Sequence, residues 1–138
     1  MAGLSLLTLL AAYAGAAAVF FALDFLWLSV IAIGFYRAEI GTLLLERPNF
    51  MAASAFYLFY VAGIVGFAVV PAVSAQSWLW AVIAGVALGL IAYGTYDMTN
   101  LATLKDWSWK VSAIDLCWGG FLSGLAALAG YWAARLTA

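Results

Sequence analysis

Four long apolar runs, separated by short polar connectors, dominate the pattern of hydrophobic and polar positions along the chain. They cover residues 4–36, 50–70, 78–101 and 109–134 approximately. A helix needs roughly 20 apolar residues to cross the hydrocarbon core of a bilayer, so each run is long enough to span it. The pattern predicts an all-α integral membrane protein, a bundle of four transmembrane helices that forms a single domain over residues 1–138.

The connector between the first two runs has a pattern of its own. Ile40, Leu43 and Leu44 recur at the spacing of one helix face, which predicts a short helix over residues 38–46 that lies in the membrane interface. Pro48 marks the end of this connector. The first run is longer than a bilayer core requires, so we expect the first helix to tilt or to project beyond one membrane face.

Composition supports a chain that has the bilayer as its solvent. Of the 138 residues, 69% are hydrophobic and 8% are charged, whereas soluble domains contain roughly 25% charged residues. A net charge of −1 and the lack of a basic stripe exclude a nucleic-acid partner. Cys117 is the single cysteine and there is no histidine, so the sequence offers no disulfide and no metal-ligand spacing, and any cofactor remains unknown.

Basic residues predict how the chain is oriented. Arg37, Arg47, Lys105 and Lys110 lie in connectors on one side of the membrane, and only Arg135 lies on the other side. Because cytoplasmic loops carry an excess of Lys and Arg, we expect both charged connectors in the cytoplasm and both termini outside it.

In this orientation the polar side chains of all four helices converge in the cytoplasmic half. A carboxylate at the bilayer centre costs roughly 2.5–3.5 kcal/mol, so such groups face the bundle interior, find partners or change protonation state. The predicted binding site consists of Asp24, Trp27, Tyr57, Tyr60, Tyr93, Asp97, Asn100, Asp115 and Trp118.

Simpler interpretations compete at several of these positions. Tyrosines and tryptophans near the interface are typical of an aromatic belt. Asp97 and Asn100 could cap the end of the third helix, and Asp115 could be a first-turn acid favoured by the helix dipole. By default, hydroxyl side chains in membrane helices bond their own backbone carbonyls, a role expected for Thr95, Thr99, Ser112 and Ser123.

Two repeated patterns concern packing and symmetry. The glycine pairs Gly85/Gly89 and Gly120/Gly124 have the spacing that allows helices to approach closely, within one bundle or between protomers. Residues 24–27 and 115–118 share an Asp-x-x-Trp pattern on helices that run in opposite directions. This echo fits an inverted repeat, and it fits chance equally well.

The chain resembles a family of bacterial membrane proteins catalogued as domain of unknown function 2177. The resemblance covers nearly the whole chain. It rests on Asp24 to Leu28, Tyr36, Ile40-Gly41, Leu43-Leu44, Pro48, Phe56-Tyr57, Tyr60, Phe67, Pro71-Ala72, Tyr93 to Leu104, Trp107, Asp115 and Trp118-Gly119. It implies a four-helix protein of the bacterial inner membrane and supplies no activity.

Three functions fit the sequence. The first is binding or transport of a small molecule or membrane lipid, with a homo-oligomer expected for a carrier because four short helices leave little room for a path. The second is an accessory or assembly subunit of a larger membrane complex. The third is an enzyme that acts on a lipid-like substrate with Asp24, Asp97 and Asp115 as acid–base groups.

Overall fold

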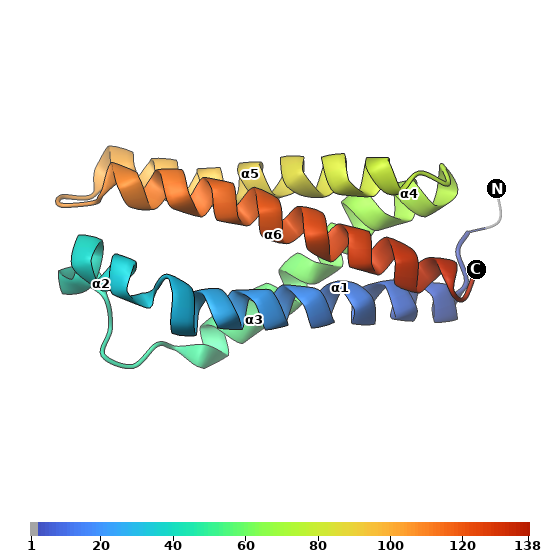
Figure 1. The fold of residues 1–138 in the computed structure, drawn as a ribbon, viewed down its shortest axis with the longest axis horizontal. Helices are drawn as coiled ribbons and strands as arrows, with labels where there is room; N and C mark the ends of the chain where they lie inside the picture. The colour runs from blue at the N-terminus through green and yellow to red at the C-terminus, as the bar shows by residue number, and fades with distance from the viewer. Residues whose placement is uncertain (1–2) are drawn as a thin grey trace.

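The computed structural model describes residues 3–138, and over that range the chain is a helical bundle. Four helices are long and apolar enough to cross a membrane, Leu6–Ile31, Phe50–Ser74, Trp78–Thr103 and Trp109–Arg135. Both termini lie at one end of the bundle, and the short helix α2 lies at the other end (Figure 1). The predicted four-helix architecture, with a short helix between the first two spans, is confirmed.

The first span is shorter than the apolar run suggests. Helix α1 (Leu6–Leu26) continues into one π-helical segment, η1 (Trp27–Ile31). The helix is then interrupted at Ala32. Helix α2 (Ile33–Ile40) and a 3₁₀ turn, η2 (Gly41–Leu43), then form the connector. The first span therefore ends at Ile31 rather than near residue 36, and the short helix begins earlier than residues 38–46.

The second span continues past residue 70, where Pro71 and the polar residues 74–77 predict a tight turn from the sequence. It consists of α3 (Phe50–Ile64), a π-helical segment η3 (Val65–Val69) and α4 (Val70–Ser74), so Pro71 lies inside the helix and not in a turn. Proline cannot donate a backbone hydrogen bond and its ring crowds the preceding turn. The wider π turn, in which the Val70 N–H bonds the Val65 carbonyl, comes directly before it and leaves room for the ring.

Helix α6 (Trp109–Arg135) is the centre of the bundle because it packs along both α5 (Trp78–Thr103) and α1 (Figure 1). The close contact between α5 and α6 depends on glycines, which have no side chain. A Cβ atom on Gly89 would lie 2.1 Å from the Gly119 carbonyl oxygen, and one on Gly85 would lie 2.7 Å from the Ser123 carbonyl oxygen. The glycine spacing therefore serves close packing between helices of one chain.

The hydrophobic core fills the middle of the bundle and its terminal end. Phe20, Val61, Ile64 and Leu122 are completely buried there, among small residues such as alanine. In α3, by contrast, no residue before Tyr60 is buried. The first half of α3 therefore stands away from the other helices and leaves space beside them.

Substitution of Gly89 by alanine should weaken the bundle. The added methyl group meets backbone of α6, which cannot move aside like a flexible side chain, so we expect a loss of about 1–3 kcal/mol in the free energy of unfolding. Thermal unfolding in detergent measures it. Gly63→Ala is the matched control, because a Cβ there meets no atom within 4 Å. Equal stability of the two variants would contradict the tight α5–α6 contact.

Candidate functional site

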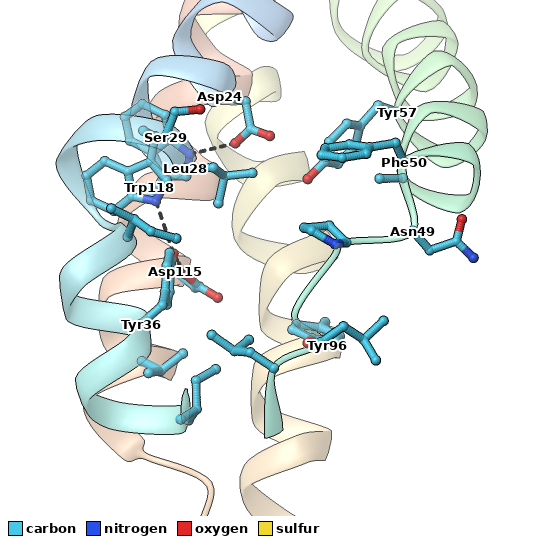
Figure 2. Close-up of a pocket in the computed structure, with 18 of the residues that line it drawn as sticks. Asp24, Leu28, Ser29, Tyr36, Asn49, Phe50, Tyr57, Tyr96, Asp115 and Trp118 are labelled. Atoms are coloured by element: carbon cyan, nitrogen blue, oxygen red, sulfur yellow. Dashed lines mark hydrogen bonds between the residues drawn. The ribbon is translucent and has the colours of Figure 1, made fainter. Parts of the chain in front are cut away.

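The space beside the first half of α3 is a cavity with a volume of about 1430 Å³. Figure 2 shows α1, α2 and α6 on one side of it and α3 on the other, with α5 behind. The connector from Gly41 to Asn49 borders it at the end of the bundle away from the termini. Of the nine predicted site residues, seven line this cavity: Asp24, Trp27, Tyr57, Tyr60, Tyr93, Asp115 and Trp118.

Two stacked tryptophans form one side of the cavity. The rings of Trp27 and Trp118 lie 4.3 Å apart between centroids with an angle of 8° between their planes. Trp27 belongs to η1 and Trp118 to α6, so the stack joins the first and the last transmembrane segment. The π turn at Trp27 is the local departure from regular helix at this contact.

Hydrogen bonds link the two tryptophans to the two aspartates, directly for Trp118 (Figure 2) and through Tyr36 for Trp27. The Trp118 indole N–H donates to Asp24 Oδ1 at 3.2 Å. The Trp27 indole N–H donates to the Tyr36 hydroxyl at 3.0 Å, and that hydroxyl in turn donates to Asp115 Oδ1. The two Asp-x-x-Trp segments thus contact each other reciprocally, an arrangement that two antiparallel helices allow.

Tyr36 of α2 links Trp27 of η1 to Asp115 of α6 through its hydroxyl group. Burial raises the pKa of its phenol above the usual range, and its hydrogen bond to Asp115 raises that pKa further. Tyr36 therefore stays a neutral donor at physiological pH. A neutral hydroxyl satisfies the Asp115 carboxylate without adding a second charge to the site.

Aromatic rings from three helices form the deep end of the cavity. Tyr57 and Tyr60 of α3 pack edge-on against the buried Phe20 of α1, with centroid distances of 5.3 and 5.6 Å. Tyr93 of α5 packs edge-on against Tyr60. The Tyr60 and Ser123 hydroxyls share a buried hydrogen bond of 2.8 Å. These contacts close the cavity toward the core, so it is a one-sided pocket.

The remaining two predicted site residues lie elsewhere. Asp97 is completely buried between α5 and α6 and does not line the cavity, and neither does the half-buried Asn100. Neither Asp97 carboxyl oxygen has a hydrogen-bond partner among residues 3–138. The Asp97 and Asp115 carboxyl groups lie close enough to interact electrostatically. Asp97 therefore lies behind the cavity wall, next to a residue that lines it.

The hydroxyl side chains divide into two groups. Thr95 and Thr99 bond carbonyls of their own helix, as predicted, at 2.7 and 2.5 Å. The same prediction is wrong for Ser112 and Ser123. Ser112 reaches across to the Asp97 carbonyl at 3.1 Å, and Ser123 bonds Tyr60. Both serines are buried at contacts between helices, where a partner on a neighbouring helix is within reach.

Some lining residues were not among the predicted site residues. Tyr36, Arg37 and Tyr96 line the cavity, as do Trp107 and the connector residues Glu46 and Asn49. The wide turn and the break at Ala32, which bring Tyr36 to Asp115, leave no clear signal in an unbroken apolar run. Among residues 3–138, no three His, Cys, Asp or Glu side chains cluster in a way that could hold a metal ion.

A double-mutant cycle tests the bond between Trp118 and Asp24. Trp118→Phe removes the donor and leaves a buried acceptor unsatisfied, which should cost about 1–3 kcal/mol of stability. Adding Asp24→Leu removes the acceptor too. The loss of stability in the double variant should therefore be smaller than the sum of the two single losses by about 1 kcal/mol. Unfolding in detergent measures all three variants.

The control cycle pairs Asp24→Leu with Trp132→Phe. Trp132 is half exposed near the C-terminal end of α6, so its effect should simply add. Additivity in the Trp118 cycle as well would show that the two side chains are not coupled.

Comparisons with known proteins give one match. Residues 9–132 match the family described as Predicted membrane protein (DUF2177). No curated protein and no solved structure matches the chain. Because the matched residues cover most of the sequence, the chain belongs to this family of multi-pass membrane proteins.

Proposed function

We propose that the protein binds a lipid or a similar amphiphile in the cavity between α1, α3, α5 and α6. The observation that carries this proposal is that the cavity wall is continuous with the apolar outer surface of the bundle. Phe25 of α1 and Phe50 and Phe56 of α3 all line the cavity, yet each is mostly exposed. In a membrane this surface faces acyl chains, so an amphiphile could enter from the bilayer.

The size of the cavity favours a lipid over a small metabolite. Pockets for drug-sized ligands have volumes of roughly 300–1,000 Å³, and this cavity exceeds that range at about 1430 Å³. A lipid head group together with the first part of its chains would fill it better. The chains could leave through the exposed side of α3.

The distribution of polar groups also suits an amphiphile. Asp24 and Asp115 lie on the side of the cavity formed by α1 and α6, and Phe50 and Phe56 lie on the side formed by α3. A ligand with one polar and one apolar end satisfies both sides. Since buried core residues such as Phe20 and Ile64 separate the cavity from the terminal end of the bundle, binding is supported better than passage through one protomer.

The orientation and membrane of the protein belong to the same proposal. We place the protein in the bacterial inner membrane, with the cavity in the cytoplasmic half and both termini outside. Arg37, Arg47, Lys105 and Lys110 all lie at or near the end where the cavity is found, and a clustering of cations on one side is typical of a cytoplasmic face.

A substitution that fills the cavity tests lipid binding. Ala53 lines the cavity from α3, so Ala53→Phe should displace the bound molecule without removing any polar contact. Native mass spectrometry after gentle purification counts the lipids that remain on the protein. Ala52→Phe is the matched control, because Ala52 is exposed on the same helix and does not line the cavity. We expect Ala53→Phe to lose the retained lipid, and equal lipid counts in both variants would contradict the proposal.

Cysteine labelling tests the orientation. In a Cys117→Ala background, Thr42→Cys places an exposed thiol in the first connector and Ala75→Cys places one in the turn at the opposite end. A membrane-impermeant maleimide added to spheroplasts should label residue 75 and not residue 42. The opposite labelling pattern would place the cavity in the outer half.

A further inference from the structure

We propose that the cavity selects lipids whose head group carries an ammonium. This inference rests on the proposed function and names the class of ligand. The relevant geometry is a buried carboxylate that lines the cavity and is surrounded by aromatic rings.

Asp24 supplies the first part of the argument. Its side chain is 4% exposed and lines the cavity. The Trp118 indole N–H donates to Asp24 Oδ1 at 3.2 Å. The Tyr57 hydroxyl faces Asp24 across the cavity (Figure 2). The two oxygens of a carboxylate offer about four acceptor positions, so Asp24 can accept a further hydrogen bond from a ligand in the cavity.

The charge of the inner wall points to a cation. Asp24 and Asp115 both line the cavity, and Asp97 lies close enough to Asp115 to interact with it electrostatically. The single basic residue of the lining, Arg37, belongs to α2 near the connector, where Glu46 also lines the cavity. The lining therefore contains three acids, Asp24, Glu46 and Asp115, and one base, Arg37. Their net charge is about −2 when all four are ionised. An ammonium would balance the acidic inner wall, whereas an anionic head group would be repelled by it.

The rings around these carboxylates suit an ammonium as well. Trp27, Tyr57, Tyr93 and Trp118 also line the cavity. Aromatic faces attract cations electrostatically, and this attraction strengthens when the cation is removed from water. An ammonium with N–H groups can donate to the Asp24 carboxylate and rest against a ring. A neutral or phosphate-only head group offers no comparable set of contacts.

A lipid competition experiment tests this selectivity. Delipidated protein in dodecyl maltoside is incubated with equal amounts of phosphatidylethanolamine and phosphatidylglycerol that have identical acyl chains. Native mass spectrometry then counts each lipid bound. Since a charge-assisted hydrogen bond is stronger than a neutral one, we expect phosphatidylethanolamine to be favoured by about tenfold or more. Equal binding, or preference for phosphatidylglycerol, would overturn the inference.

Variants connect the preference to the carboxylates. Asp24→Asn and Asp115→Asn should each reduce the preference toward equal binding, because each removes a negative charge from the wall and keeps the shape of the side chain. Asp106→Asn is the matched control, since Asp106 lies in the exposed loop between α5 and α6 and does not line the cavity. A full preference in both site variants would overturn the inference.

Single-chain probes keep the test valid if a site variant fails to fold. Dodecylamine should displace bound phosphatidylethanolamine from the wild-type protein at about tenfold lower concentration than dodecanol, which has the same chain and no charge. Equal displacement by the two would overturn the ammonium preference. Ala53→Phe separates this result from the broader proposal. If that variant retains as much lipid as Ala52→Phe, the proposal that lipid binds in the cavity is contradicted. If Ala53→Phe loses its lipid but the wild-type protein binds both phospholipids equally, only the ammonium preference is contradicted.

Discussion

The site depends on one reciprocal contact, the stacked Trp27–Trp118 pair with its hydrogen bonds to Asp24 and, through Tyr36, to Asp115. Unpaired carboxylates inside a membrane are costly, and this contact gives each of the two a donor from a different segment of the chain. It therefore sets the register between the first and the last span. It also holds α2 against α6 at the edge of the cavity. Removing Trp118 would take the indole donor from the buried Asp24, and removing Tyr36 would take the hydroxyl donor from Asp115.

The same register explains why a cavity exists. Glycines hold α5 against α6, and the aspartate–tryptophan contacts hold α1 and α2 against α6. Helix α3 joins this assembly only from Tyr60 onward, through the core residues Val61 and Ile64. Its first half carries exposed phenylalanines and has no buried side chain. A membrane supplies lipid at such a surface, so an occupant drawn from the bilayer follows from the arrangement of the helices.

Much of this structure could be predicted from the sequence because the length and hydropathy of an apolar run identify a membrane helix. Seven of the nine expected site residues line one cavity, since depth in the membrane and helix direction already place them together. The periodicity of an α-helix no longer predicts which side chains share a face where the α-helix gives way to a π-helix. The first span ends at the break at Ala32, after the π-helical segment that begins at Trp27, and Tyr36 of the following helix then reaches Asp115. Asp97 shares a helix face with Tyr93 in sequence, but contact with α6 buries it, and spacing along one helix cannot show which neighbour covers a side chain.

The most direct test of this account is an experimental structure of the protein purified with its native lipids. We expect lipid density in the cavity between α1 and α3, with a head-group donor about 3 Å from an oxygen of the Asp24 carboxylate and acyl chains leaving past Phe50 and Phe56. The Trp27–Trp118 stack should be intact beside it. A structure in which the first half of α3 closes against α5 and leaves no cavity would contradict the account.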